Sequence, residues 1–376
     1  MSIKTKTALI LSGGGARGAY QVGVLKALGE LIPKEQENPF NIICGTSAGA
    51  INAAKIATEM DDFHQAIVGL EDIWSNLSSK KVHKVDYLTV LKSVVKIFIS
   101  FFHRGIAKGQ SLSLFDNRPL FHLLRRSINM NRLSTMIKRE HLHALSINAL
   151  GYTSGRNIAF FEGHSSISEW RKARRVGKRA NLRHKHLMAS SAIPAVFPAV
   201  RLNNEYFGDG ALRQSAPLSS ALHLGADKIL VIGVSGDAPE TEHLGTSQSP
   251  TIAQVFGNML NSAFIDAIDE DLAMLERFNK FAKCMNAEQQ QQLGIRPVDI
   301  LVIKPSLQFD ELASEYEQHL PKTMRFLLSI VGANKKGDGS SLASYVLFEK
   351  AYCTALIDQG YEDAMQQVAE IKAFLK

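Results

Sequence analysis

The stretch Thr7–Gly18, which reads TALILSGGGARG, decides the fold class. Its first residues form an apolar run typical of a short buried strand, and three consecutive glycines then make a loop. The residues that follow, up to Ile32, place apolar side chains at helical spacing. A second apolar run, Phe40–Cys44, leads into the pentapeptide GTSAG and a helix of small residues that ends near Ala57. Two strand–helix pairs in direct succession predict parallel strands, and therefore an α/β fold.

The rest of the chain continues this alternation of strands and helices. The predicted elements are strands at 143–150, 157–162, 228–234 and 299–303, and helices at 61–76, 85–103, 117–129, 131–140, 185–193 and 251–285. We expect a catalytic domain at 5–305, followed by a helical C-terminal extension at 306–376. Within the domain, 80–186 is expected to form a basic, partly helical insert or cap region.

The composition excludes several classes of protein. Apolar residues make up 45% of the chain and charged residues 21%, which is incompatible with general disorder. The three cysteines, Cys44, Cys284 and Cys353, are too far apart for a disulfide framework or a CxxC metal site. No charge-free apolar run reaches the roughly 20 residues that span a bilayer, and Ala8–Leu11 is too short for a signal peptide. We expect a cytoplasmic protein with peripheral membrane contact; export by a non-Sec route stays open.

The net charge of +7 is distributed unevenly along the chain. Residues 80–186 hold 22 basic and 5 acidic side chains, a charge of +17, whereas 1–79 carries −2 and 187–376 carries −8. Within the basic segment, 171–185 contains eight basic residues and no acid. This run fits either a solvated surface or a contact with anionic lipid headgroups. Nucleic-acid binding is disfavoured because Trp170 is almost the only aromatic residue available for stacking on bases.

The loop Gly13–Gly18 matches the pattern GxGxxG between a strand and a helix, which is the setting of dinucleotide-binding loops. The second strand, however, leads into Gly45-Thr46-Ser47 and lacks the acidic residue that would bind a ribose. Ala19 and Tyr20 replace the Lys–Ser/Thr pair of a P-loop. What remains is a set of unhindered backbone amides at a helix N-terminus, which can stabilise an anion or a transient oxyanion.

The pentapeptide Gly45-Thr46-Ser47-Ala48-Gly49 is a GxSxG sequence between a strand and a small-residue helix. In this setting the two glycines allow a sharp turn that exposes the serine hydroxyl at the start of the helix. The helix dipole also stabilises negative charge there. Ser47 is therefore the candidate nucleophile, with a helix N-cap serine as the alternative.

A serine nucleophile needs a base to accept its proton. Asp209 stands between two glycines in the segment FGDGA, 207–211, where close backbone approach would let the carboxylate point into a site. Such a carboxylate can act as the base if apolar surroundings raise its pKa, although an ordinary Asp-Gly turn is the alternative. The histidines His223, His243 and His319 occur in no recognisable active-site pattern.

Together, GGGARG at 13–18, GTSAG at 45–49 and DGA at 209–211 resemble the motifs of the patatin-like phospholipase family, in the same order. The stretch ASSAIPAVFP, 189–198, also resembles the segment ahead of that family's aspartate. The resemblance implies a three-layer α/β/α fold with a mostly parallel central sheet and added helices. It also implies a Ser–Asp dyad that requires no catalytic histidine, no metal and no cofactor.

Roles are carried over by position from this resemblance. It implies that Ser47 is the nucleophile and Asp209 the base. The remaining motif residues are the oxyanion-hole residues Gly13, Gly14 and Gly15, the loop-supporting Arg17, and the elbow glycines Gly45 and Gly49.

The sequence thus predicts a lipid acyl hydrolase of the phospholipase A or lysophospholipase type, which cleaves carboxylic esters through an acyl-enzyme. Two alternatives come from other classes: a nucleotide-binding protein that uses Gly13–Gly18, and a non-catalytic lipid-binding protein with the same fold. The expected partners are an acyl-lipid substrate and an anionic membrane surface, which residues 171–185 would contact. No nucleic-acid partner is expected.

Overall fold

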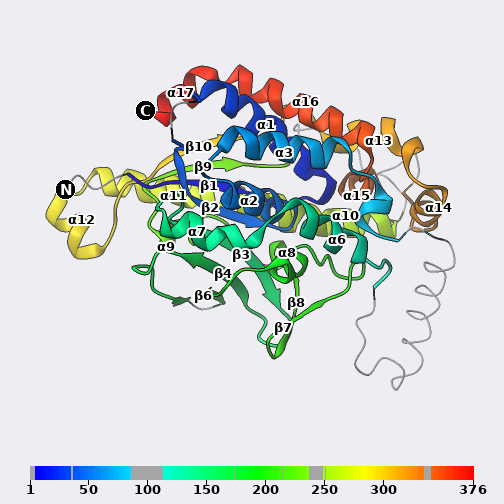
Figure 1. Ribbon diagram of the computed structural model, residues 1–376, viewed down its shortest axis with the longest axis horizontal. Coiled ribbons are helices and arrows are strands. Elements are labelled where there is room, and N and C mark those ends of the chain that lie inside the picture. The colour runs from blue at the N-terminus through cyan, green and yellow to red at the C-terminus, as the bar shows by residue number, and fades with distance from the viewer. Residues whose placement is uncertain are drawn as a thin grey trace.

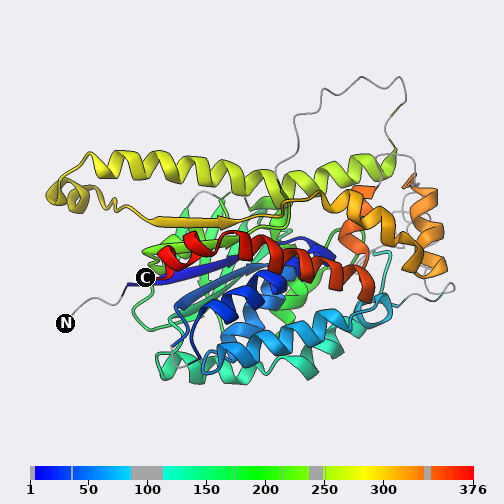
Figure 2. The same cartoon turned by 90° about the horizontal axis from the view of Figure 1, so that it is seen from above.

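The structure is a computed structural model that describes residues 5–34, 37–84, 86, 113–172, 174–214, 216–236, 249, 251–333 and 340–376. The predicted helix at 85–103 therefore lies outside the described residues, apart from its second residue. Figure 1 shows a central sheet with helices packed on it, and Figure 2 shows the same arrangement from above. This confirms the predicted α/β architecture with a mostly parallel central sheet.

The parallel part of the sheet positions the site. Strand β1 (Thr7–Leu11) pairs in parallel with β2 (Phe40–Thr46) on one side and with β9 (Lys228–Ile232) on the other. Beyond these lie β10 (Asp299–Ile303), parallel to β9, and β3 (Ala144–Gly151), parallel to β2. The carboxyl ends of these strands share one edge of the sheet, which is where open α/β sheets bind their ligands.

Beyond β3 the sheet is mixed. Strands β4 (Asn157–Gly163) and β8 (Glu205–Asp209) both pair antiparallel with β3, and β8 does so at its carboxyl end. Strand β6 (Arg175–Arg179) runs parallel to β4, while β5 (Trp170–Lys172) and β7 (Val200–Leu202) form hairpins with β6 and β8. Part of the basic run 171–185 is thus the edge of the sheet, a role that the sequence did not predict.

Helices cover both faces of the sheet, as alternation along the buried strands requires. In β1, Leu9 contributes to the core under α1, α2 and α3, whereas Ile10 contributes to the core under α9 and α11. These helices have the bounds α1 Gly18–Leu31, α2 Ala48–Thr58, α3 Phe63–Ser75, α9 Ser219–Leu224 and α11 Ala267–Lys283. The shorter ones are α4 Ser79–Val82, α6 Arg118–Ser127, α7 Leu133–Lys138, α8 His184–Ser190 and α12 Ala287–Leu293. The predicted helix at 185–193 therefore ends three residues early.

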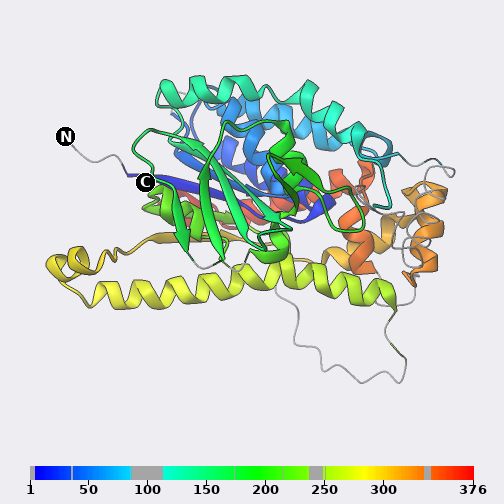
Figure 3. The same ribbon diagram turned by 90° about the horizontal axis from the view of Figure 1, so that it is seen from below.

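The predicted helix at 251–285 is present but interrupted. It consists of α10 (Ile252–Asn261), a π-helical turn η4 (Ser262–Asp266) and α11. The side chains of Thr251 and Gln254 begin it with a reciprocal capping box. Figure 3 shows these three segments in line along the length of the molecule.

One of the C-terminal helices packs along the first helix. Helix α16 (Lys350–Gln366) lies beside α1, as Figures 1 and 2 show, and the Tyr20 hydroxyl donates to Asp363 at 3.0 Å. The other helices beyond β10 are α13 Phe309–Tyr316, α14 Lys322–Ile330, α15 Ser340–Val346 and α17 Val368–Leu375. Within the described ranges, no helix has both the length and the apolar character needed to cross a bilayer.

Candidate active site

Ser47 occupies a sharp turn between β2 and α2. Its backbone angles, φ 54° and ψ −123°, are ones that a residue with a side chain rarely adopts. A Cβ at Gly45 would lie 2.5 Å from the Gly49 carbonyl oxygen, and one at Gly49 would overlap the Leu11 carbonyl oxygen. Only glycine fits at both positions. The two elbow glycines therefore let the turn close, and the strain at Ser47 indicates a functional position.

The Ser47 hydroxyl donates a hydrogen bond of 2.6 Å to the Asp209 carboxylate. Asp209 is the last residue of β8 and reaches Ser47 because β8 pairs with the carboxyl end of β3, next to β2. The other carboxylate oxygen accepts from the Ala211 amide at 3.0 Å. Asn157 donates to the Gly210 carbonyl at 2.6 Å and so holds the turn that follows. The structure brings together two candidate residues that are 162 positions apart in the chain.

Burial shifts the pKa of Asp209. Its side chain is fully buried, and this desolvation raises its pKa from 3.8 to about 7, against the opposing effect of the hydrogen bonds from Ser47 and Ala211. A carboxylate with a pKa near neutral pH is suited to accept and return a proton.

The candidate histidines in the described residues contact other groups. His223 stacks on Trp170 at 4.8 Å and hydrogen-bonds Ser219, whereas His319 packs beside Tyr316. His243 lies outside the described residues. Among the described residues, the Ser47 hydroxyl donates to Asp209, and the Ser47 amide donates to the Ser190 hydroxyl at 2.8 Å.

The glycine loop lies beside the elbow. A Cβ placed on Gly13 would be 3.1 Å from the Ser47 Cβ, so backbone of the loop closely approaches the serine. Within the described part of the chain, the Gly13 and Gly14 amides donate to no other backbone group. Gly15, with φ 57°, begins the short 3₁₀ helix η1 (Gly15–Arg17) that leads into α1. Val234 packs against Gly14 and the Tyr345 carbonyl against Gly15, which disfavours the dinucleotide interpretation of this loop.

An apolar cavity of about 40 Å³ extends from Ser47 on the side of α2, α3 and α6. Apart from Ser47 and Ser191, the side chains that line it are apolar. They include Ile51, Trp74, Leu120, Leu124, Ile193 and Phe348. The hydroxyl of Ser47 therefore stands where hydrocarbon could be accommodated.

A sequence model of the patatin-like phospholipase family matches residues 9–222, which is more than half of the chain. The chain belongs to the patatin-like phospholipase family. All three motifs of this patatin-like chain, including Ser47 and Asp209, lie within the matched residues.

Two curated relatives are phospholipases. The cGAMP-activated phospholipase of Pseudomonas aeruginosa (strain BWHPSA011 / Pa011) is 26% identical over 221 residues, which cover 59% of this chain and 57% of that protein. The calcium-independent phospholipase A2-gamma of Rattus norvegicus is 25% identical over 231 residues, which cover 57% of this chain and 25% of that protein. This chain thus spans about half the length of the first relative and a quarter of the second. Among solved structures, VipD from Legionella pneumophila aligns with 100% of this chain and 88% of its own, at 13% identity and a TM-score of 0.33.

The buried Arg17 of this patatin-like chain is held by residues beyond the family match. Its side chain is 2% exposed and donates to Asp310 at 2.5 Å and to Ser344 at 2.7 and 2.9 Å. Its guanidinium also lies over the Tyr345 ring, 4.0 Å from the centroid. These partners come from α13 and α15, so the C-terminal helices fix the loop that carries Gly13–Gly15. The sequence indicated Arg17 but gave no sign of its partners.

Removing the carboxylate that pairs with Arg17 should loosen this loop. Asp310→Asn is expected to lower the free energy of unfolding by about 1–3 kcal/mol, because a buried guanidinium loses its counter-ion. It should also slow labelling of Ser47 by a fluorophosphonate by roughly tenfold, if the loop amides stabilise the transition state. Asp61→Asn is the matched control, since Asp61 pairs with Arg132 at 2.5 Å and both aspartates are 31% exposed. Equal labelling rates in both variants would contradict a role of Asp310 in the site.

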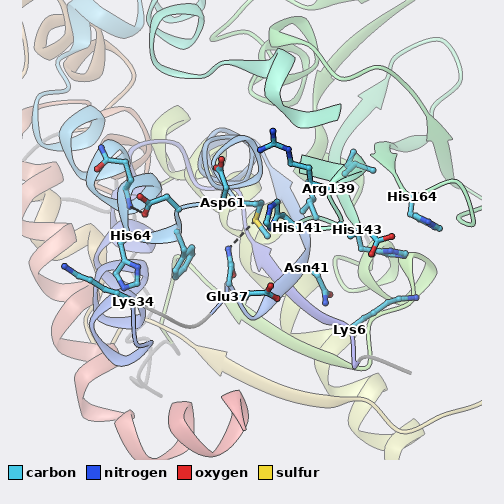
Figure 4. A pocket seen from close by; sticks show the side chains of 18 of the residues that line it. Lys6, Lys34, Glu37, Asn41, Asp61, His64, Arg139, His141, His143 and His164 are labelled. Carbon is cyan, nitrogen blue, oxygen red and sulfur yellow. Dashed lines mark hydrogen bonds between the residues drawn. The ribbon is translucent and has the colours of Figure 1, made fainter. Parts of the chain in front are cut away.

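A much larger cavity, of about 980 Å³, lies at the opposite end of the sheet. Figure 4 shows its polar lining, which includes Lys6, Asn41 and His143, next to the amino ends of β1, β2 and β3. Neither Ser47 nor Asp209 contributes to it. The candidate chemistry of this chain therefore resides at the small apolar cavity and not at this larger one.

Proposed function

We propose that the protein is a lipid acyl hydrolase of the phospholipase A or lysophospholipase type. The observation that carries the proposal is the 2.6 Å hydrogen bond from Ser47 to the buried Asp209, beside an apolar cavity. A hydroxyl paired with a base can attack a carboxylic ester, and an adjacent hydrocarbon-lined space can take part of an acyl chain. The phospholipase names of the two curated relatives agree with a lipid ester as substrate.

In the proposed mechanism, Ser47 Oγ attacks the ester carbonyl carbon while Asp209 accepts the hydroxyl proton. The carbonyl oxygen becomes an oxyanion that accepts hydrogen bonds from the amides of the Gly13–Gly15 loop. When the intermediate collapses, the bond to the leaving alcohol breaks and Asp209 returns the proton to that alcohol. Water then attacks the acyl-enzyme, its proton passes to Asp209 and then to Ser47 Oγ, and the fatty acid leaves. Every step uses groups of this chain and one water molecule.

The rate of this reaction should depend on the ionisation of Asp209. Because only the carboxylate form accepts the Ser47 proton, kcat/KM for a soluble ester is expected to fall as the pH is lowered through about 7. Below that pH the slope should correspond to one proton. A pH–rate profile on a short-chain p-nitrophenyl ester measures this limb. A midpoint near the ordinary aspartate pKa of 3.8 would contradict the role of Asp209 as a buried base.

The basic run 171–185 supports a contact with anionic lipid headgroups. Arg171, Lys172 and Arg174 are exposed at the edge of the sheet. Arg179 has a structural role as well, because it donates to three backbone carbonyl oxygens, including that of Gly163 at 2.7 Å. The exposed cations are thus available to a membrane surface, where each basic residue contributes about 1 kcal/mol. We therefore propose that the protein acts as a peripheral protein at the cytoplasmic side of a membrane.

A lipid panel tests the proposed function. Purified protein is incubated with a phosphatidylcholine, a lysophosphatidylcholine and a triacylglycerol, and released fatty acid is quantified. We expect release from at least one of these lipids, without added metal, and none in Ser47→Ala. Fatty-acid release that is unchanged in Ser47→Ala would overturn the proposal, as would the absence of release from every ester offered.

A further inference from the structure

Helix α10 has large apolar side chains on its solvent-facing side as well as on its core-facing side. Ala253 and Leu260 are buried, whereas Ile252, Val255 and Met259 are 70%, 48% and 58% exposed. The exposed residues follow at spacings of three and four, so they lie along one face of the helix. The polar residues of this helix, Gln254, Asn258 and Asn261, carry no charge. Large apolar side chains that gather on an exposed face are a mark of a surface that meets a partner or lipid.

Helix α14 adds two exposed apolar residues next to the start of α10. The Ala253 amide donates to the Val331 carbonyl at 2.9 Å, which joins the beginning of α10 to the end of α14. Phe326 and Ile330 on α14 are 53% and 63% exposed and lie one turn apart. We define the apolar end patch as the residues Ile252, Val255, Met259, Phe326 and Ile330.

The apolar end patch lies at the same end of the molecule as the candidate active site. Phe264, in the turn that follows α10, packs against Gly13 and stacks on Tyr345 with ring centroids 5.4 Å apart. Met259 precedes Phe264 by only about 8 Å of helix. Figures 2 and 3 show α10 and α14 together at one end, with α12 at the other. A membrane in contact with this patch would therefore face the end of the molecule that contains the Gly13–Gly15 loop.

Together, the two helices that carry the patch have cations and no carboxylates. Neither α10 nor α14 contains an acidic residue, and α14 carries the exposed cations Lys322 and Arg325. The exposed part of α11 differs, because it mixes the carboxylates Glu270 and Glu276 with the cations Arg277, Lys280 and Lys283. Exposed apolar side chains that are flanked by cations and free of carboxylates are typical of elements that enter the headgroup region of a bilayer.

We propose that the apolar end patch docks onto an anionic bilayer and turns the active-site end towards it. This inference rests on the proposed function, because the bilayer is where an acyl-lipid substrate would be found. Apolar contact by α10 and α14 supplements the electrostatic attraction of the basic run 171–185. The two surfaces are separable, since they belong to different elements and respond to different substitutions.

Binding to vesicles tests the proposal. The full chain is mixed with vesicles of phosphatidylcholine and phosphatidylglycerol, and the bound fraction is measured by sedimentation. The pair Phe326→Asp with Ile330→Asp is expected to lower the partition coefficient at least ~10-fold, because two apolar groups become charged. The matched control is Phe278→Asp with Phe281→Asp on α11, whose side chains are 47% and 62% exposed but lie towards the far end. We expect less than a twofold change in the control.

Further measurements separate the outcomes. Val255→Ser with Met259→Ser is a milder pair on α10 that should also lower binding. The proposal would be overturned if the aspartate pairs on α14 and α11 lowered vesicle binding equally. It would also be overturned if vesicle binding fell only after Arg171→Glu with Lys172→Glu. A third contrary result is that the aspartate pair on α14 converts a dimer of the protein into a monomer and leaves vesicle binding unaltered. The patch would then contact a second copy of the chain. Hydrolysis of a soluble ester is measured on the same samples. If the unsubstituted chain does not hydrolyse the ester but its vesicle binding still depends on the patch, the proposed function is refuted and the docking proposal is not.

Discussion

Replacing Ser47 by alanine is expected to abolish both ester hydrolysis and covalent labelling by a fluorophosphonate probe. The hydroxyl that donates to Asp209 at 2.6 Å would be gone, and no acyl-enzyme could form. Loss of a nucleophile of this kind typically lowers kcat by about 10⁴-fold or more. The fold should persist, because alanine fills the same space and leaves the turn at φ 54° with the same backbone strain. Labelling followed by peptide mass spectrometry and rates on a soluble ester measure the effect.

Ser146→Ala is the matched control for this prediction. Ser146 is also fully buried, on the neighbouring strand β3, and its hydroxyl has no hydrogen-bond partner in the described part of the chain. Its replacement should leave both labelling and hydrolysis within about twofold, because its hydroxyl forms no hydrogen bond with Ser47 or Asp209. If Ser47→Ala retains full labelling, the nucleophile is another residue.

The parts of the site that could be predicted from the sequence are those encoded over short distances. The elbow at Ser47 depends on glycines two residues away on either side, so its geometry is written in five consecutive residues. The buried strands were also predicted well, and β10 (Asp299–Ile303) has the predicted bounds, because short apolar runs are a strong signal for strands inside a parallel sheet. Asp209 lies far from Ser47 in the chain, but the flanking glycines and the family resemblance singled it out.

The parts that could not be predicted depend on long-range packing. Strands β5 to β8 have three to five residues each, and two of them lie in a basic run whose side chains resemble a solvated loop. The partners of Arg17 are 293 and 327 residues away, and a lone aspartate or serine carries no local signature. The exposed apolar face of α10 was hidden for a similar reason, because periodicity predicts a helix but not which of its faces meets solvent.

Asp209→Asn is expected to separate activity from stability. The amide cannot accept the Ser47 proton, so we expect hydrolysis to fall by about 10³-fold or more.

The same change should stabilise the fold at alkaline pH. Because burial raises the pKa of Asp209 from 3.8 to about 7, the unfolded chain releases this proton at a lower pH than the folded chain does. Raising the pH from about 4 to 7 therefore favours unfolding of the native protein, and asparagine removes this penalty.

The expected gain in stability of Asp209→Asn with rising pH can be measured directly. Thermal unfolding is measured for the native chain and for Asp209→Asn at pH 5 and pH 8. The variant should have the higher Tm at pH 8, and its advantage should shrink at pH 5, where Asp209 is largely protonated and uncharged in the folded state. One pKa unit corresponds to about 1.4 kcal/mol, so a gain of a few kcal/mol is the upper limit. Ser146→Ala should instead give the same Tm difference at both pH values. A pH-independent difference for Asp209→Asn would mean that the buried carboxylate does not carry the raised pKa on which its role as base depends.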